Sequence, residues 1–191
     1  MKKAELRNVT KVYDGKTVLS DYSVTIENGK RYCVMGPSGS GKTTLLRLLT
    51  GLEKPDKGEA VYDRTEVKAW VFQEDRLIPH LNAVDNCALV TDRPDRTRIE
   101  ALLTEAGLGD SLTVPVRNLS GGMARRAAVV RALTSGADCL IMDEPLKGLD
   151  EATKQTVLQM ISRETKGKTL VYVTHDRSEY EALGGELIEL T

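Results

Sequence analysis

The chain has 191 residues, of which 40% are hydrophobic and 29% charged, a balance typical of one globular domain. A formal net charge of −1 and an aromatic content of 4% argue against a nucleic acid as the main partner, because they offer neither electrostatic attraction nor base stacking. No apolar run reaches about eighteen residues, so the sequence predicts no membrane-spanning helix. The 3 cysteines lie far apart without a CxxC spacing, and we expect buried thiols in a reducing compartment.

The first thirty residues indicate antiparallel β-structure. Val24 and Ile26 alternate with polar neighbours, and the pairs Asp14-Gly15 and Asn28-Gly29 are typical of turns. A further turn is expected over 54–58.

Beyond this region, apolar strands alternate with helices. Strands are expected at 32–35, 68–72, 139–142, 169–173 and 186–190. Helices are expected after the glycine-rich loop, carrying the leucines at 45, 46, 48 and 49 and ended by Gly51, and at 151–163 and 177–183. This alternation predicts an α/β fold with a mainly parallel sheet and right-handed crossovers.

The middle of the chain has a helical pattern and no convincing strand. Helices are expected over 82–90, over 95–106 and from about 121 to 134. We therefore expect a single domain, 1–191, with a core at 1–75 and 137–191 and a helical subdomain inserted at about 76–136.

Residues 36–43 match the phosphate-loop pattern GxxxxGK[ST] in full, with a strand before the loop and a helix after it. Glycines let backbone N–H groups face a phosphate, and the helix N-terminus adds partial positive charge. We expect Lys42 to contact the β- and γ-phosphates of a nucleotide and the Thr43 hydroxyl to bind Mg²⁺. The residues expected to contact the nucleotide here are Gly36, Pro37, Ser38, Gly39, Ser40, Gly41, Lys42, Thr43 and Thr44.

A phosphate loop alone is compatible with a kinase, a GTPase or a motor protein, and a second motif narrows the choice. The apolar strand at 139–142 ends in two adjacent carboxylates, Asp143 and Glu144. Asp143 is expected to hold Mg²⁺ through water. Neighbouring side chains diverge at a strand end, so Glu144 can act as the general base that polarises the attacking water. By itself, a buried strand with a solvated acidic end explains the pair equally well.

The sequence Leu-Ser-Gly-Gly-Met at 119–123 opens a predicted helix. Its plain structural interpretation is an N-cap serine with two turn glycines. Its functional interpretation is a second anion-binding helix terminus, which a head-to-tail dimer would use to close the partner's ATP. With this motif the sequence resembles the ABC ATPase family, whose most distinctive mark is Leu-Ser-Gly-Gly. The resemblance implies that Ser120, Gly121 and Gly122 contact nucleotide.

The resemblance extends to single residues in the family's order along the chain. It makes Gln73 a Mg²⁺ sensor that faces the membrane partner, and His175 the switch histidine at the γ-phosphate. Tyr13 lies where the family stacks an aromatic ring on adenine, and Asp150 where it contacts the opposite subunit. Taken singly, such residues are more often structural. The implied metal ligands are Thr43, Gln73 and Asp143, and the implied catalytic residues are Lys42, Glu144 and His175.

The sequence departs from the family in three places, and the last is that only sixteen residues (191 − 175) follow His175, so that no regulatory C-terminal domain is expected. Met123 stands where the family usually has glutamine, and we expect a modest effect because the serine and glycines before it are intact. The stretch from Gly51 to Gln73 is shorter than in most relatives, which should trim the antiparallel layer.

The resemblance implies a P-loop NTPase core with an N-terminal antiparallel β layer and an inserted helical subdomain. It also implies an ATP-hydrolysing, Mg²⁺-dependent transporter subunit on the cytoplasmic face of the cell membrane. The implied partners are a second ATPase subunit, in an ATP-dependent homodimer, a membrane permease and an external solute-binding protein.

Two alternatives are less favoured. Non-transport ABC ATPases of DNA repair or translation typically carry long coiled coils or two fused cassettes, and neither is expected to fit in 191 residues. A P-loop kinase or GTPase does not need residues 119–122, and no guanine-reading Asn-Lys-x-Asp is present.

Residues 72–86 resemble the permease-docking segment of nitrate, sulfonate, taurine and thiamine-precursor importers. This resemblance suggests import of a small solute of that kind, although many importers share such a segment by descent. The apolar cluster at 77–81 is the expected docking surface, and ordinary packing inside the helical insertion is the alternative.

Overall fold

The computed structural model describes residues 3–63 and 67–191 of the chain. By internal contacts it divides into two compact units. The first runs to Lys68 and adds Asp138–Asp143 and Gly167–Thr191, and the second comprises Ala69–Ala137 and Glu144–Lys166. The units differ in their bounds from the predicted core and insertion, because 69–75 and 144–166 group with the helices. Residues 1–2 and 64–66 of the predicted domain lie outside the described residues.

The first unit contains the predicted antiparallel layer. Strands β1 (Lys3–Tyr13) and β2 (Lys16–Glu27) form a hairpin, and both turn residues, Asp14 and Gly15, have the positive φ of a two-residue hairpin turn. Strand β4 (Lys57–Val61) pairs antiparallel with β1, so the order is β2-β1-β4. The sequence predicted a turn at 54–58 and missed β4. This strand is mostly exposed and therefore lacks the apolar alternation that reveals a strand.

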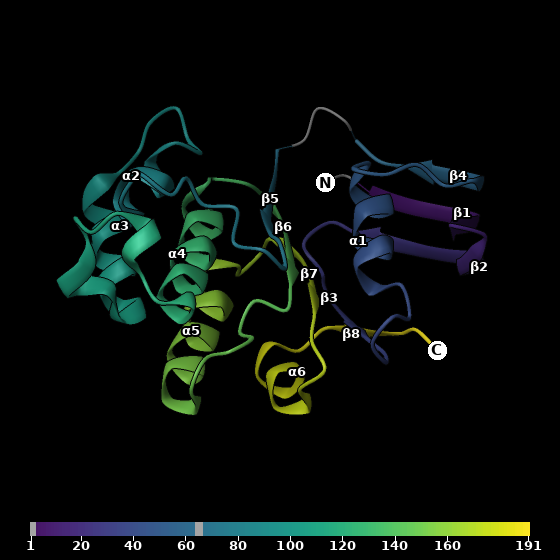
Figure 1. The fold of residues 1–191 in the computed structure, drawn as a ribbon. Coiled ribbons are helices and arrows are strands. Elements are labelled where there is room, and N and C mark those ends of the chain that lie inside the picture. Colours follow the sequence, from purple (N-terminus) through teal and green to yellow (C-terminus); the bar gives the residue numbers. More distant parts are fainter. Residues whose placement is uncertain (1–2, 64–66) are drawn as a thin grey trace. The chain divides into compact units, whose positions relative to one another are not determined.

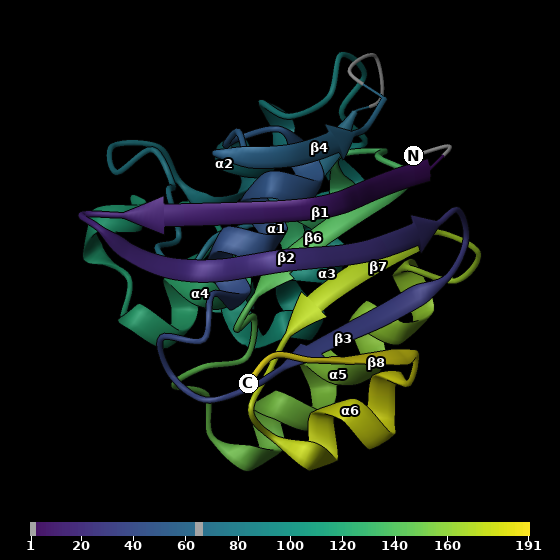
Figure 2. The ribbon, with the colours of Figure 1, turned by 90° about the vertical axis from the view of Figure 1, so that its right-hand side faces the viewer.

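The second sheet has five strands in the order β5-β6-β7-β3-β8. These are β3 (Arg31–Met35), β5 (Lys68–Val71), β6 (Cys139–Asp143), β7 (Thr169–Val173) and β8 (Glu186–Glu189). The pairs β6–β7, β7–β3 and β3–β8 are parallel, which Figure 2 shows from one side of the sheet. Strands β6 and β7 are buried at every position, as expected for parallel strands covered on both faces. The predicted α/β fold with a mainly parallel sheet is confirmed.

Helix α1 (Lys42–Thr50) fills the interior of the first unit (Figure 1). It carries four leucines, Leu45, Leu46, Leu48 and Leu49, and all four are at most 1% exposed. The helix contacts β1, β4 and β7, so it packs against both sheets. It ends at Gly51, which has a φ of 74° and donates its N–H to Leu48 O.

The second unit is built around helix α4. Its other helices are α2 (Ala83–Ala88), α3 (Arg96–Leu103) and α5 (Glu151–Glu164), with α4 spanning Gly121–Thr134. Helix α4 contacts all three, and its buried face is rich in alanine, which permits close approach. The predicted helix over 95–106 is interrupted, since α3 passes into a π-helical turn, η1 (Thr104–Leu108), that holds Gly107 at a φ of 75°. Two short 3-10 turns, η2 (Gly109–Ser111) and η3 (Val116–Asn118), follow.

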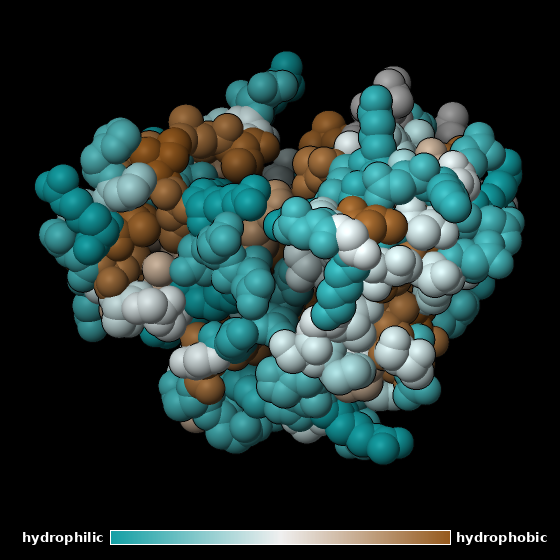
Figure 3. All heavy atoms as spheres, turned by 45° about the vertical axis from the view of Figure 1, so that its right-hand side comes forward, coloured by the Kyte–Doolittle hydropathy of each residue, from teal (hydrophilic) through white to brown (hydrophobic). Residues whose placement is uncertain are grey.

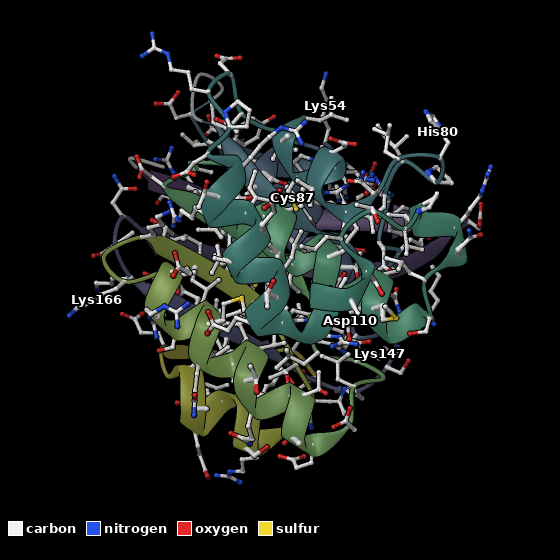
Figure 4. All side chains as sticks on the ribbon, turned by 90° about the vertical axis from the view of Figure 1, so that its left-hand side faces the viewer. Lys54, His80, Cys87, Asp110, Lys147 and Lys166 are labelled. Carbon is white, nitrogen blue, oxygen red and sulfur yellow. The ribbon has the colours of Figure 1, made fainter. Side chains whose placement is uncertain are left out.

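Cys33, Cys87 and Cys139 are buried and form no disulfide, which confirms the prediction for these thiols. Burial raises the pKa of Cys33 and Cys139 to about 11 and that of Cys87 to about 12, so all three stay protonated near neutral pH. Figure 4 shows Cys87 among the helices of the second unit. Over the residues that the structure describes, no helix combines the length and apolarity needed to cross a membrane.

Gly58 is the glycine whose replacement tests the antiparallel layer most directly. It has a φ of 80°, and a Cβ would lie 2.3 Å from the backbone oxygen of Asn8. Gly15 has a φ of 78° with no atom within 4 Å of its Cβ position, so Gly15→Ala measures the backbone cost alone. We expect Gly15→Ala to lower the free energy of unfolding by about 1–2 kcal/mol. We expect Gly58→Ala to lower it by more, measured by urea titration. Equal losses would show that β1 relaxes away from the new methyl group.

Candidate functional site

The phosphate loop follows β3 in the first unit, and its glycines are required by geometry. Gly36 has a φ of 152°, and a Cβ there would lie 2.3 Å from the backbone oxygen of Leu190. Gly41 has a φ of 92°, and its Cβ would lie 2.8 Å from Cγ1 of Val18. Both positions therefore exclude a larger residue.

The loop offers unused hydrogen-bonding capacity. Ser40 Oγ is the one buried side-chain oxygen or nitrogen without a hydrogen-bond partner in the described part of the chain. No side chain caps the N-terminus of α1, which begins directly after Gly41. A hydroxyl donor and uncapped helix amides together suit a phosphate group.

The side chain of Lys42 is held by backbone oxygens of the phosphate loop. Its Nζ donates to the backbone oxygens of Gly36, at 2.8 Å, and Pro37, at 2.7 Å. The ammonium charge thus lies near the N-terminus of α1, where both favour an anion. The predicted role of Lys42 as a phosphate contact fits this position.

Thr43 and Asp143 form a hydrogen bond within the first unit. Thr43 Oγ1 donates to Asp143 Oδ2 at 2.6 Å, and Asp143 is 3% exposed at the end of β6. The described residues contain no group of three or more His, Cys, Asp or Glu that could hold a metal ion. A Mg²⁺ at this place would use hydroxyl and carboxylate oxygens, nucleotide phosphates and water, which is the ligand set that Mg²⁺ prefers. The third predicted ligand, Gln73, is exposed and belongs to the second unit.

Tyr13 is fixed by Glu53 and Lys11. Its hydroxyl donates to Glu53 Oε2 at 2.5 Å, and the Lys11 ammonium lies 5.2 Å from its ring centroid. Lys11 also pairs with Glu53 Oε1 at 3.1 Å. Burial, together with the hydrogen bond to Glu53, raises the pKa of Tyr13, so the ring stays neutral. The supporting role of Glu53 could not be seen in the sequence, and adenine stacking on Tyr13 stays a prediction.

His175 is exposed on the turn that follows β7. The preceding Thr174 is buried and donates its Oγ1 to the buried Glu179 at 2.6 Å, on helix α6 (Arg177–Leu183). Asp176 N donates to the same Thr174 oxygen at 3.0 Å. These bonds fix the turn that presents His175. A carboxylate five positions after a strand-end threonine was the available sequence signal, and it was missed.

The predicted signature residues lie in the second unit. Ser120 caps α4 by accepting from Met123 N at 3.3 Å, and both Ser120 and Gly121 are exposed. A Cβ on Gly121 would meet no atom within 4 Å, so this helix end is open to solvent. Met123, the departure from the family pattern, is half-buried beyond the cap.

Asp150 serves as the N-cap of α5 in the second unit. Its carboxylate accepts from Thr153 N at 3.0 Å and from Thr153 Oγ1 at 2.7 Å. Both hydrogen bonds lower the pKa of the Asp150 carboxyl, and the one from the backbone N–H of Thr153 has the larger effect. Its predicted contact with an opposite subunit stays a prediction.

Glu144 has an unusual backbone and a cationic partner. Its φ is 48°, an uncommon value for a non-glycine residue and one often found at functional sites. Lys147 Nζ donates to Glu144 Oε2 at 2.7 Å, and the Glu144 side chain is 17% exposed. Lys147, which Figure 4 marks before α5, was not singled out from the sequence.

The predicted site residues thus fall into two groups. The first unit holds Tyr13, residues 36–44, Asp143 and His175. The second holds Gln73, residues 120–122, Glu144 and Asp150. Within the first unit, the phosphate loop, Asp143 and His175 all follow the carboxyl ends of adjacent parallel strands, so they meet at one edge of the sheet (Figure 2).

The chain resembles known proteins in sequence and in structure. The family model described as ABC transporter matches residues 19–147. A spermidine/putrescine import ATP-binding protein, PotA of Mesoplasma florum, is 34% identical over 96% of the chain. The chain spans 57% of the length of that curated relative.

Two solved structures are similar over 98% of the chain and 94% of their own length. One is a dimeric post-hydrolysis state of the ATP-binding cassette MJ0796 bound to ADP and Pi, with 31% identity and a TM-score of 0.87. The other is a dimeric structure of the same bacterial ABC transporter cassette, with 32% identity and a TM-score of 0.86.

The position of Lys42 generates a first binding test. Lys42→Ala removes a charge-assisted phosphate contact, and such hydrogen bonds contribute about 1.5–3 kcal/mol. We expect ATP affinity, measured by titration calorimetry, to fall accordingly. Lys166→Ala, at an exposed lysine of the second unit (Figure 4), is the control and should leave affinity unchanged. Equal affinities of the two variants would remove Lys42 from the nucleotide site.

Proposed function

Because the chain belongs to the ABC transporter family, we propose that it binds and hydrolyses Mg-ATP as one subunit of a transporter whose membrane-spanning part is a separate permease. By family and by fold the chain is an ABC-type ATPase. The observation that carries the proposal is the phosphate loop with its partnerless Ser40 hydroxyl, beside the Thr43–Asp143 contact of 2.6 Å. Together they provide phosphate donors and hard oxygen ligands at one edge of a sheet.

Each residue of the proposed site has a defined task. Lys42 and the N-terminus of α1 hold the phosphates, while Thr43 and Asp143 hold the metal ion. Mg²⁺, when bound, neutralises phosphate charge during transfer. Glu144, whose carboxylate is ion-paired with Lys147, accepts the proton of the attacking water. His175 contacts the γ-phosphate from the turn fixed by Thr174 and Glu179.

We infer that two copies of the chain act together. The N-terminus of α4 is capped by Ser120 and exposed to solvent, and among the described residues no atom lies within 4 Å of a Cβ position on Gly121. In a head-to-tail dimer this end closes the ATP held by the partner's phosphate loop. The dimeric state of the similar solved cassettes supports this arrangement.

The proposed permease surface lies on the second unit, around residues 77–81. Hydrophobic side chains gather on the helical part visible in Figure 3, and the exposed apolar residues of this unit include Ile78, Leu89 and Val90. His80 projects outward from the same loop (Figure 4). Leu77 and Leu81 are only half-exposed.

The side chain of Asn86 fixes this loop by hydrogen bonds to its backbone. A fixed loop favours a binding surface over a disordered connection. Asn86 is 2% exposed, accepts from Ile78 N at 2.7 Å and donates to Ile78 O at 3.1 Å. A preorganised loop loses less entropy on binding. We propose that it receives a short cytoplasmic helix of the permease, which keeps the chain on the cytoplasmic face of the cell membrane.

For the cargo we propose import of a small solute delivered by an external solute-binding protein. The resemblance of residues 72–86 suggests a sulfonate, nitrate or thiamine precursor, whereas the curated relative is named for spermidine and putrescine. Both resemblances concern importers. Competition between these solutes for uptake by the complete transporter distinguishes an anionic from a polyamine cargo.

The proposed base generates a test of turnover and assembly. Glu144→Gln keeps the side-chain shape but accepts no proton, so we expect turnover to fall by roughly 10²–10⁴-fold. ATP binding should persist and accumulate a dimer on gel filtration. The matched control is Glu151→Gln, at a carboxylate that is 69% exposed on α5, and it should hydrolyse normally. A Glu144→Gln chain that hydrolyses ATP normally and stays monomeric would place the base elsewhere.

The proposed docking loop generates a test of partner binding. Ile78→Asp places a charge at a side chain that is 37% exposed, so we expect permease association and transport to fall together without loss of the unfolding midpoint. Leu187→Asp, at an apolar residue of the first unit that is 42% exposed, should leave association intact. Retained association in Ile78→Asp would move the docking surface, and loss of folding would make Ile78 a packing residue.

A further inference from the structure

Arg125 is a buried cation on helix α4 of the second unit. It lies one turn into α4, and its side chain is 5% exposed. Arginine is rarely buried this deeply unless its donors are paired, because an unpaired buried charge is costly. The partners of this guanidinium therefore indicate what the residue does.

The partners belong to two functional segments outside α4. Nη1 donates to the backbone oxygen of Phe72 at 2.5 Å and pairs with Asp75 Oδ1 at 3.0 Å. Nη2 donates to the backbone oxygen of Glu144 at 2.5 Å. Phe72 and Asp75 flank the proposed sensor Gln73, and Glu144 is the proposed base. The planar guanidinium has donors in fixed directions, so one side chain sets the relative positions of both segments and of α4.

Arg131, further along α4, holds the same segment by a separate route. It donates to the backbone oxygens of Asp75, at 3.0 Å, and Arg76, at 2.7 Å. The segment 72–76 is therefore bound along α4 by two arginines. Of these two, Arg125 is the one with a hydrogen bond to Glu144.

The backbone of Glu144 needs such support. A non-glycine residue at a φ of 48° is strained and keeps that conformation only when its surroundings enforce it. The bond from Arg125 to the Glu144 carbonyl is one enforcing contact, and it comes from the helix that begins with Ser120.

We propose that Arg125 is a positioning residue for ATP hydrolysis, which fixes the backbone of Glu144 relative to the Gln73 segment and the signature helix. The inference rests on the proposed function, in which Glu144 is the base and Gln73 the sensor. Arg125 does not touch the reacting atoms and acts through the two segments that it joins. A displacement of the Gln73 segment is transmitted to the base by this side chain.

The test compares Arg125→Gln and Arg125→Lys with the unchanged chain. We expect Arg125→Gln to lower kcat by about 10- to 100-fold, because small displacements of a catalytic group cost that much. The KM for ATP should change less than kcat, because Lys42 and Thr43 remain in the first unit. Arg125→Lys keeps the charge without the fork and should recover part of the loss. Amide hydrogen exchange at 72–76 and 144–148 should quicken in Arg125→Gln.

The control is Arg163→Gln, which removes an arginine of the same unit whose side chain is 52% exposed and pairs with Glu105. It should leave kcat and the exchange at 72–76 unchanged. If Arg125→Gln does not fold, Arg125→Lys tests the positioning role instead, because it retains the buried positive charge. A folded Arg125→Lys chain with unchanged kcat and unchanged exchange would overturn the inference.

Failure of this inference is distinguishable from failure of the proposed function. Hydrolysis by the unchanged chain together with inactive Glu144→Gln establishes the function without reference to Arg125. Unchanged kcat in Arg125→Gln then refutes only the positioning role. An unchanged chain without ATPase activity refutes the function and the positioning role together, even where the exchange data show that Arg125 holds 72–76.

Discussion

The parallel pairing of β6, β7 and β3 is the constraint on which the proposed nucleotide site depends. Adjacent parallel strands end at the same edge, so residues far apart in sequence are delivered to one place. The Thr43–Asp143 hydrogen bond joins the helix after β3 to the end of β6 across 100 sequence positions. The strands hold this edge because β6 and β7 are buried at every position and cannot shift without exposing apolar surface.

The second unit is organised by a helix instead of a sheet. Helix α4 begins at the exposed Ser120 cap, carries Arg125 on its buried side and contacts α2. Helix α2 carries Asn86, which holds the proposed docking loop at Ile78. A proposed partner surface, a signature motif and the Glu144 backbone are thus all connected to one helix. Such a contiguous set of packed elements can transmit a displacement.

The ion pairs of this unit differ in how much they contribute to stability. The pair between Arg163 and Glu105 lies at the surface, where water screens it and its contribution to stability is small. Arg125 is 5% exposed, and removing one partner from such a site leaves a buried group unsatisfied. The Lys147–Glu144 pair lies between these cases, because the Lys147 side chain is 56% exposed and that of Glu144 is 17% exposed.

The sequence by itself determined the strands of the parallel sheet, the main helices, the phosphate loop and the carboxylates at the end of β6, because these are local patterns of period and turn chemistry. It missed β4, whose exposed side chains carry no period, and the π-helical form of the turn that contains Gly107, where Arg126 donates to Ala106 O. Only the tertiary structure decided which groups support the site. Glu53 lies 40 positions from Tyr13, Arg125 lies 53 positions from Phe72, and no periodicity relates residues so distant. Their contacts exist only because the folded sheets and helices bring them together.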